Sequence, residues 1–446
     1  MYARVAAVAA IAVVTMLVTS CSPAAESNDG GPVPVTALLI GYPDDDGIDA
    51  DTGDDVPGIL QLQDAFNDVH DDVELTIVNI PWGEGSTGYA AKTEAMIQAN
   101  EACVYEMPAA QDYGRRGFLT NLDELIAADD DFTNVWGDQL ETARESSPTG
   151  DLWYIPSNTG IRVINWDAQI FDDFGVEPLS QTPTLDEIAE KAEELTGINP
   201  RTGEQNYGYW YQGKYTVWQF LAIAHAYGAE WGETNDDGTM SIDWDTPEYL
   251  GALEWFVDVS QYAPDGALAS DAMPDGFLTD TNVVGIIPEG EAGYFLQSFI
   301  NDPSLAERYR TSFNLKGSDG LGGLNSVTPV TISADCETPE EAFTALKWLA
   351  GSDESQKYYF DSLGRLPVTD GSAEALPEVD ALPDGEVILM QSLTAEAMYP
   401  WAAEDPRWAL QTALEAALAG TLSPADALKQ AQTETELWLS DQGLNQ

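Results

Sequence analysis

Basic residues are scarce in this chain. Of its 446 residues, 17 are Lys or Arg and 77 are Asp or Glu, so the net charge at pH 7 is −60. Such a surface repels nucleic-acid phosphates and anionic lipid headgroups, which excludes both as partners. Self-repulsion destabilises so charged a compact chain unless salt screens it, and at about 1 M salt the Debye length is only about 3 Å. Two explanations of this acidity are a halophilic source and a cationic ligand. Because the carboxylates are spread along the whole chain, the composition favours the halophilic source.

Histidine and cysteine are almost absent. Neither His70 nor His225 has a Cys or His neighbour at metal-ligand spacing, which argues against a transition-metal site. Cys103 and Cys336 either pair or are buried as small hydrophobic residues. The sequence also lacks a Gly-rich phosphate loop, a Gly-x-Ser-x-Gly elbow and a His-Glu-x-x-His motif, which removes the commonest motif-bearing enzymes. We expect no cofactor and no resident metal.

The apolar run near the N-terminus is too short to cross a membrane. Residues 5–18 form a run of 14 residues after Arg4, and at about 1.5 Å each they cannot span about 30 Å of hydrocarbon. The run is typical of an export signal. Val18-Thr19-Ser20-Cys21 resembles a bacterial lipobox, which predicts a signal over residues 1–20, a lipid on Cys21 and a flexible linker over residues 21–32. The alternative is an ordinary signal that discards Cys21; either way the protein works outside the cytoplasmic membrane.

The remaining chain alternates strand and helix patterns. It is longer than one hydrophobic core usually serves, so two lobes are expected. Apolar runs at 33–40 and 73–80 predict buried strands, and helical spacing at 58–69 and 89–99 predicts helices between parallel strands. Residues 152–166 are extended over too great a length for one sheet, and we expect them to pass from one lobe to the other.

Local signals mark several helix starts and one loop. Thr184-Leu185-Asp186-Glu187 predicts a capping box that opens a helix ending near Thr196, and Thr338-Pro339-Glu340-Glu341 repeats this pattern. Pro247 and Pro424 start two further helices. The loop at 42–57 holds seven aspartates. It lacks the glycine that an EF-hand loop needs, so we interpret it as a solvated surface loop in preference to a calcium site.

The order of several weak motifs is more specific than any one of them. The motifs are the turn 117–123, the extended segment 152–156, Asn165, the helix start 183–188 with Leu185 where a tryptophan is usual, the segment 364–368 and the segment 416–427. In this order the chain resembles the extracellular solute-binding proteins of ABC importers, in the branch that includes the maltose-binding protein, from about residue 33 to 440. The resemblance implies two lobes, each a mostly parallel sheet flanked by helices, with a ligand cleft between them that closes by hinge bending. It implies a first lobe of residues 33–156 with 320–368 returning to it, and a second of residues 157–319 with 369–446 returning to it.

The resemblance also implies the residues that line the cleft. A sugar site needs flat apolar surfaces for ring faces and hydrogen-bonding groups for hydroxyls. Stacking is assigned to Trp82, Tyr215, Trp218 and Trp408, and hydrogen bonding to Asp44, Glu106, Asn158 and Arg407. The other candidates are Tyr42, Tyr105, Arg162 and Glu289. For each aromatic residue the alternative is packing in a core or between lobes.

The sequence departs from the family pattern where a Gly-x-Trp is usual. Residues 285–291 offer carboxylates there, Glu289 among them, and residues 102–104 replace a usual acidic motif. These departures admit a smaller sugar, a glycosylated osmolyte or a cationic solute. The resemblance thus predicts a monomeric, lipid-anchored, non-enzymatic receptor that delivers a carbohydrate to permease subunits. The alternatives are capture of a polyamine or other cation, and a secreted glycosidase, which would need a pair of carboxylates about 5 to 10 Å apart.

Overall fold

The computed structural model describes residues 31–43, 47, 56–81, 87–108, 110–145, 147, 149–230, 232–235, 239–270, 273–315, 324–369, 376–394, 396–397 and 404–445. Its strands are β1 (Val33–Ile40), β2 (Val73–Ile80), β3 (Val104–Glu106), β4 (Ile155–Asp167), β5 (Gly197–Ile198), β6 (Gln205–Tyr209), β7 (Glu233–Thr234), β8 (Met240–Ser241), β9 (Val284–Glu291), β10 (Tyr309–Ser312), β11 (Leu324–Ile332) and β12 (Glu396–Ala397). Its helices are α1 (Ile59–Asn67), α2 (Thr87–Gln98), α3 (Ala110–Arg115), α4 (Asp123–Ala128), α5 (Gln139–Glu145), α6 (Ala168–Phe174), α7 (Leu185–Glu194), η1 (Gly213–Tyr215), α8 (Thr216–Ala226), α9 (Pro247–Ser260), η2 (Ala267–Ala269), α10 (Ala292–Asn301), α11 (Pro303–Arg308), α12 (Pro339–Gly351), α13 (Asp353–Leu363), α14 (Pro377–Asp380), α15 (Gly385–Thr394), α16 (Glu404–Leu418) and α17 (Pro424–Asp441).

The predicted signal, Cys21 and the linker up to residue 30 lie outside the described residues, as does most of the aspartate-rich loop. Within the described ranges, no helix has both the length and the apolar character needed to cross a membrane.

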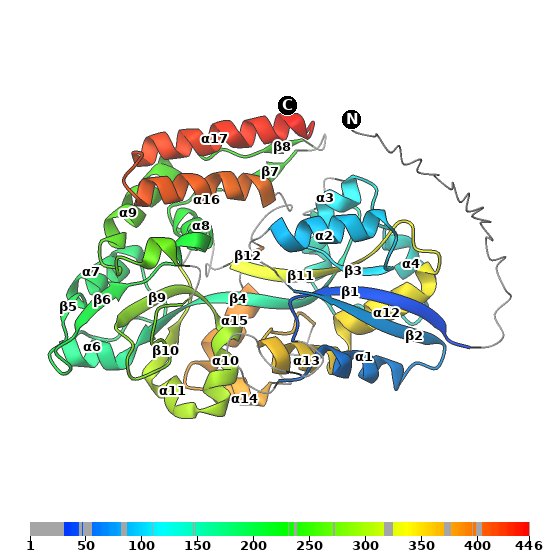
Figure 1. The fold of residues 1–446 in the computed structure, drawn as a ribbon, viewed down its shortest axis with the longest axis horizontal. Helices are drawn as coiled ribbons and strands as arrows, with labels where there is room; N and C mark the ends of the chain where they lie inside the picture. The colour runs from blue at the N-terminus through cyan, green and yellow to red at the C-terminus, as the bar shows by residue number, and fades with distance from the viewer. Residues whose placement is uncertain are drawn as a thin grey trace, which may run out of the picture.

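Most strands join one mixed sheet in the order β2-β1-β3-β11-β4-β9-β6-β5 (Figure 1). β1 runs parallel to both β2 and β3, and β6 runs parallel to β9. Between these parallel regions, β11 is antiparallel to β3 and to β4, and β4 is antiparallel to β9. The predicted strands at 33–40 and 73–80 form with the predicted bounds. The α/β architecture is confirmed, and antiparallel strands cross its centre.

Strand β4 connects the two halves of the sheet. Its first part, Ile155–Ile161, pairs with β11, and its second part pairs with β9 and β10. Ile155 packs in one hydrophobic cluster and Ile164 in another. With 13 residues, β4 is longer than the usual strand of about 5–6. It crosses the middle of the molecule in Figure 1 and stays paired within one sheet, so the expectation that this segment is too long for one sheet is wrong. Its passage from one lobe to the other stays a prediction.

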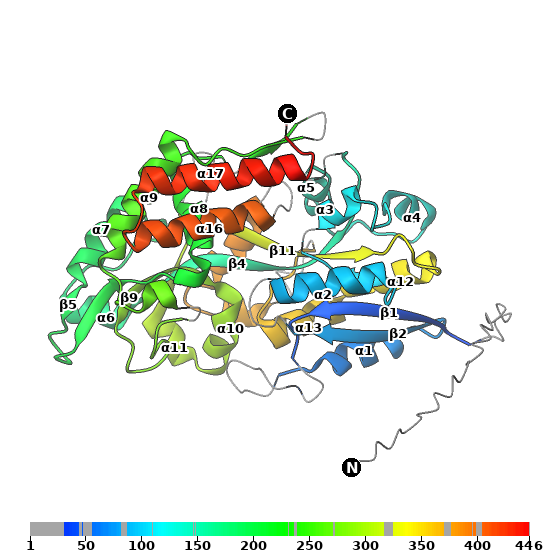
Figure 2. The ribbon, with the colours of Figure 1, turned by 45° about the horizontal axis from the view of Figure 1, so that its top comes forward.

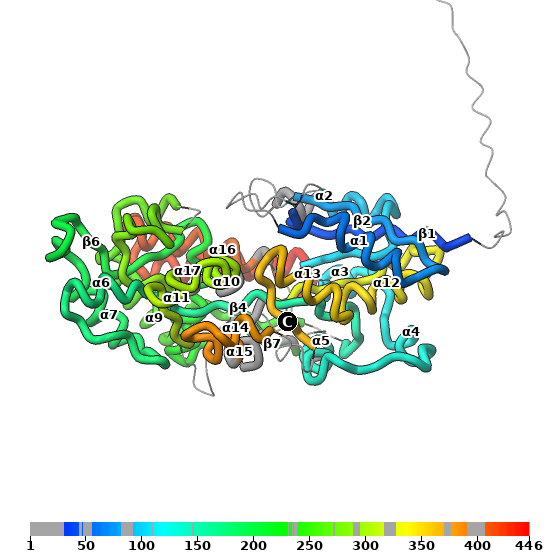
Figure 3. Tube along the Cα trace, turned by 90° about the horizontal axis from the view of Figure 1, so that it is seen from below, coloured from blue at the N-terminus to red at the C-terminus, as the bar shows by residue number. Residues whose placement is uncertain are grey.

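Two large hydrophobic clusters fill the two halves. One combines β1, β2 and β3 with α1 and α12; the other combines β6 and β9 with α8, α9, α16 and α17. Helices α16 and α17 run side by side along the second half (Figure 2). A smaller cluster joins Ile161 and Val163 of β4 to residues of α10 and α13–α15. These helices lie below β4 in Figure 1 and are seen from below in Figure 3. We propose that the two large clusters are the cores of the two lobes.

The two predicted capping boxes have different outcomes. The Thr184 hydroxyl accepts a hydrogen bond from the Glu187 backbone N–H (3.1 Å), as predicted, but the Glu187 carboxylate accepts from Ser180 instead of closing the box. The prediction for Thr338 is wrong, because its side chain does not cap α12. The Thr338 hydroxyl instead lies 4.0 Å from the Cys103 sulfur and 3.9 Å from the Cys336 sulfur.

Those two cysteines form a disulfide across 233 residues of sequence. Cys103 immediately precedes β3, and Cys336 lies between β11 and α12. The Ser333 N–H also donates to the Cys103 carbonyl (2.9 Å). The bond therefore ties an early strand of the first half to the segment that returns to it late in the chain.

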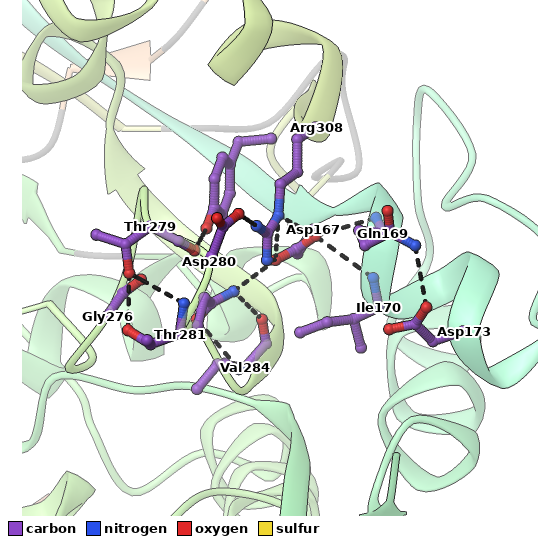
Figure 4. A network of polar contacts seen from close by, with 12 residues as sticks. Asp167, Gln169, Ile170, Asp173, Gly276, Thr279, Asp280, Thr281, Val284 and Arg308 are labelled. Atoms are coloured by element: carbon purple, nitrogen blue, oxygen red, sulfur yellow. Dashed lines mark hydrogen bonds and ion pairs between the residues drawn. The ribbon is translucent and has the colours of Figure 1, made fainter. Parts of the chain in front are cut away.

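A buried carboxylate organises the far end of β4. Asp167 accepts two hydrogen bonds from N–H groups of the first turn of α6, at 3.0 and 3.4 Å. Its side chain also accepts from Arg308 and from Asn282, each at 2.8 Å (Figure 4). Asp280 accepts a further hydrogen bond from Arg308 Nη1 (3.1 Å). One carboxylate thus joins β4, α6, α11 and the loop before β9.

Candidate ligand-binding site

An open hollow lies in the second half, beside β4. Its wall combines aromatic rings with hydrogen-bonding groups, from Arg162, Trp210, Gln212, Tyr215, Trp218, Gln219, Met273, Ile287 and Pro288. Three of these, Arg162, Tyr215 and Trp218, are residues that the sequence predicts for the site. The mixture of flat apolar and polar surface is the kind that binds small polar organic molecules.

Local sequence brings three of these side chains to one side of a helix start. Tyr215, Trp218 and Gln219 are spaced by three and four positions at the junction of η1 and α8, so they share a face. Gly213 permits the close packing of η1 on η2, since a Cβ there would lie 2.1 Å from the Leu268 carbonyl oxygen.

Helix α16 holds this junction in place. The Gln411 side chain accepts from the Val217 N–H (2.9 Å) and donates to the Gly213 carbonyl (2.8 Å). Gln411 is buried, so these bonds are shielded from water. The C-terminal part of the chain therefore positions the aromatic wall of the hollow.

Two arginines contact the ring of Trp218. The guanidinium carbon of Arg407 lies 4.4 Å from the ring centroid and that of Arg162 lies 5.3 Å from it. Arg407 also lies 4.7 Å from the ring of Trp408. These are cation–π distances, so Trp218 is contacted by positive groups from both β4 and α16. The structure thus brings together Arg162, Tyr215, Trp218, Arg407 and Trp408.

The predicted residues of the first half form a separate cluster. Tyr42 is buried against the rings of Tyr358 and Tyr359, and it contacts Glu106, which also accepts from the Ile40 N–H (3.4 Å). Burial raises the pKa of Glu106 to about 7. The hydrogen bonds from Ile40 and Tyr42 act in the opposite direction and lower this pKa, but burial is the larger effect. Burial and the Glu106 charge together raise the pKa of Tyr42 well above its usual value.

Two further predicted residues are buried elsewhere in the fold. Tyr105 is fully buried, donates to the Met96 carbonyl (3.2 Å) and belongs to the first hydrophobic cluster. Asn158 lies on β4, where its side chain donates to Ser157 (3.0 Å) and accepts from Thr328 of β11 (2.8 Å). Neither lines the hollow. Asp44 and Trp82 lie outside the described residues, and Glu289 lies on β9 with its side chain outside the described part.

The sequence analysis did not identify six residues of the wall: Trp210, Gln212, Gln219, Met273, Ile287 and Pro288. Gln219 is the one that a sequence signal could have identified, because it lies four positions after Tyr215 on the same face. Trp210 is placed by sheet pairing, since its N–H donates to the Ile286 carbonyl (3.0 Å). Ile287 and Pro288 approach through β9, which is distant in sequence.

Comparison with known proteins identifies the family. The model of the family described as bacterial extracellular solute-binding protein matches residues 49–356. Among solved structures, an ABC substrate-binding protein of Listeria monocytogenes in complex with cycloalternan has a TM-score of 0.71 and 19% identity, covering 91% of this chain and 99% of that one. The cyclic α-maltosyl-1,6-maltose binding protein of Arthrobacter globiformis has a TM-score of 0.69 and 20% identity, covering 92% and 100%.

The maltose-bound MalE3 protein of T. maritima has a TM-score of 0.68 and 18% identity, covering 91% of this chain and 100% of that one. No curated protein matches the chain. At these identities the solved structures show a common fold, and the family model covers more than half of the sequence. The chain therefore belongs to the family of bacterial extracellular solute-binding proteins.

Proposed function

We propose that this protein captures a sugar or oligosaccharide outside the cytoplasmic membrane and delivers it unchanged to the permease subunits of an ABC importer. The observation that carries the proposal is the hollow beside β4, where Trp210, Tyr215 and Trp218 supply ring surfaces and Gln212 and Gln219 supply hydrogen-bonding groups. Aromatic faces stack on the C–H faces of sugar rings, and amides bind hydroxyls. The cycloalternan-bound and maltose-bound structures of the same fold support this proposal, as does the cyclic α-maltosyl-1,6-maltose binding protein.

The anchoring proposal rests on the lipobox-like sequence at Cys21. A lipid on this cysteine anchors the protein at the extracytoplasmic face of the cell membrane, and residues 22–32 serve as a flexible tether. Radiolabelled palmitate should enter the wild-type chain in a bacterial host. A Cys21→Ser variant should incorporate none, and equal labelling of the two would contradict the anchor.

Thermal-shift screening in high salt tests the binding proposal. We expect maltose, mannitol, ribitol or tagatose to raise the melting temperature of the purified protein, by an amount that grows with the logarithm of the ligand concentration once this exceeds the dissociation constant. Chromatography of the ligand afterwards should recover it intact. Released monosaccharide would show an enzyme, and stabilisation by spermidine alone would show a receptor for cations.

A further inference from the structure

Two buried polar atoms in the hollow have no hydrogen-bond partner among the residues that the structure describes. Trp210 is 6% exposed and Gln219 is 4% exposed. The indole Nε1–H of Trp210 and the amide oxygen Oε1 of Gln219 are buried and form no hydrogen bond within the described part of the chain. An unsatisfied buried group of this kind costs about 1–3 kcal/mol. Both residues line the same hollow, so a bound molecule is the natural partner for both atoms.

The orientation of the Gln219 amide is fixed by the backbone. Its Nε2 donates to the Pro288 carbonyl (2.8 Å) and to the Trp210 carbonyl (3.3 Å). Turning the amide over would place Oε1 against two carbonyl oxygens, which is repulsive, so this assignment is the favourable one. Both amide N–H groups of Gln219 therefore bind protein carbonyls. The group of Gln219 that remains for a ligand is the acceptor oxygen Oε1.

The two buried groups that lack a hydrogen bond within the described residues are thus one donor, the Trp210 Nε1–H, and one acceptor, Gln219 Oε1. A hydroxyl satisfies both, since it carries one O–H donor and two acceptor lone pairs. A protonated amine has donors only and leaves the indole N–H unpaired, whereas a carboxylate has acceptors only and leaves Gln219 Oε1 unpaired. The Arg162 guanidinium in the same wall also disfavours a cationic group.

We propose that Trp210 Nε1 and Gln219 Oε1 determine specificity by binding one hydroxyl, or two neighbouring hydroxyls, of a neutral sugar or polyol. This inference rests on the proposed function and adds the residues that select hydroxylated solutes over polyamines and organic acids. A site built to pair a hydroxyl rejects a ligand that lacks it, because the buried groups are then left unpaired.

The test compares substitutions of two tryptophans, Trp210 and Trp255, whose indole Nε1 atoms are both buried without a hydrogen bond within the described residues. Trp210→Phe removes the indole N–H from the hollow. Trp255→Phe is the matched control: its Nε1 is also buried without a hydrogen bond within the described residues, but the ring packs on Tyr209 and does not line the hollow. The probe is whichever of maltose, mannitol, ribitol and tagatose stabilises the wild type most. Calorimetry should give a dissociation constant raised about 5- to 150-fold by Trp210→Phe and less than about 3-fold by Trp255→Phe.

A second measurement uses the wild-type protein alone. Monodeoxy analogues of the same probe replace each hydroxyl by hydrogen in turn. At least one position should raise the dissociation constant tenfold or more, and spermidine and glucuronate should not compete for the site. This series decides the question even if Trp210→Phe does not fold.

The outcomes separate the two proposals. If a sugar or polyol binds but Trp210→Phe binds it as tightly as the wild type does, or no deoxy position matters, the inference fails and the proposed function stands. If no sugar or polyol binds, both fail.

Discussion

The guanidinium carbon of Arg407 lies 4.4 Å from the centroid of the Trp218 ring. This contact joins α16, near the C-terminus, to the first turn of α8, which forms part of the hollow. The late helix α16 therefore contacts the wall of the hollow through Arg407 as well as through the hydrogen bonds of Gln411. Removing the charge should loosen Trp218 without removing the ring.

Arg407→Met keeps most of the side-chain length and removes the cation. The cation–π contribution of about 0.5–2 kcal/mol should be lost, so the affinity for the sugar or polyol identified by screening should fall about 2- to 30-fold. Calorimetry checks this. Arg116→Met is the control, since Arg116 lies 5.1 Å from the ring of Tyr113 and 4.9 Å from that of Phe118, away from the hollow. Equal losses of affinity in the two variants would contradict the role given to Arg407.

Asp167→Asn should be strongly destabilising. The side chain of Asp167 is fully buried, and it carries the charge that compensates a largely buried Arg308. Breaking a buried pair by removing one partner costs about 3–5 kcal/mol, because the other charge stays buried. Urea unfolding measures the change. Asp280→Asn removes the exposed partner of the same arginine and should cost less than about 1 kcal/mol. Similar costs for the two substitutions would disprove this assignment.

The fold is largely predictable because its signals are local. Apolar runs fixed the bounds of β1 and β2, and the Thr184 hydroxyl caps α7 as its sequence predicts. Thr338 follows the same pattern and fails, since its hydroxyl turns toward the sulfur atoms of a disulfide whose second cysteine is 233 residues from the first. The sequence leaves the pairing of these cysteines open.

The site is less predictable because its wall is assembled from distant segments. Tyr215 and Trp218 share a helix face and were predicted together, whereas Ile287 and Pro288 reach the hollow through β9, which pairs with both β4 and β6. Tyr105 and Glu106 are adjacent on β3, so alternation along the strand places them on opposite sides. One lies in the hydrophobic core and the other against Tyr42.

Reduction of the Cys103–Cys336 disulfide should lower the stability of the fold. A bond that closes 233 residues removes much conformational freedom from the unfolded chain, and losing such a bond typically costs about 2–5 kcal/mol. The melting temperature should fall when dithiothreitol is added. A Cys103→Ala, Cys336→Ala double variant should start from the lower value and not respond to the reductant. A wild-type protein insensitive to verified reduction would contradict the expectation.

Glu106 should make stability fall as pH rises. Its pKa is about 7 in the folded protein, above the usual 4.5, so the folded state retains a proton that the unfolded state releases. The stabilisation is fully present below pH 4.5 and is lost by about pH 7, a change of about 3 kcal/mol. Urea unfolding of the wild type and of Glu106→Gln across this range should show a difference that grows with pH in favour of the variant. A constant difference would mean that Glu106 does not titrate there.

The net charge of −60 predicts a strong dependence of stability on salt. The 17 basic residues can neutralise only a minority of the 77 acidic ones, so repulsion among carboxylates remains in the folded state and weakens when the chain expands. Raising NaCl from 0.1 to 1 M shortens the Debye length from about 10 to about 3 Å. We expect the melting temperature to rise steeply over this range and then level off, because screening is complete once the Debye length is below the spacing of the charges. KCl should act like NaCl, whereas sucrose at the same osmolality should not reproduce the steep phase. A melting temperature that is unchanged between 0.1 and 1 M of either salt would show that the acidic surface imposes no repulsion that needs screening.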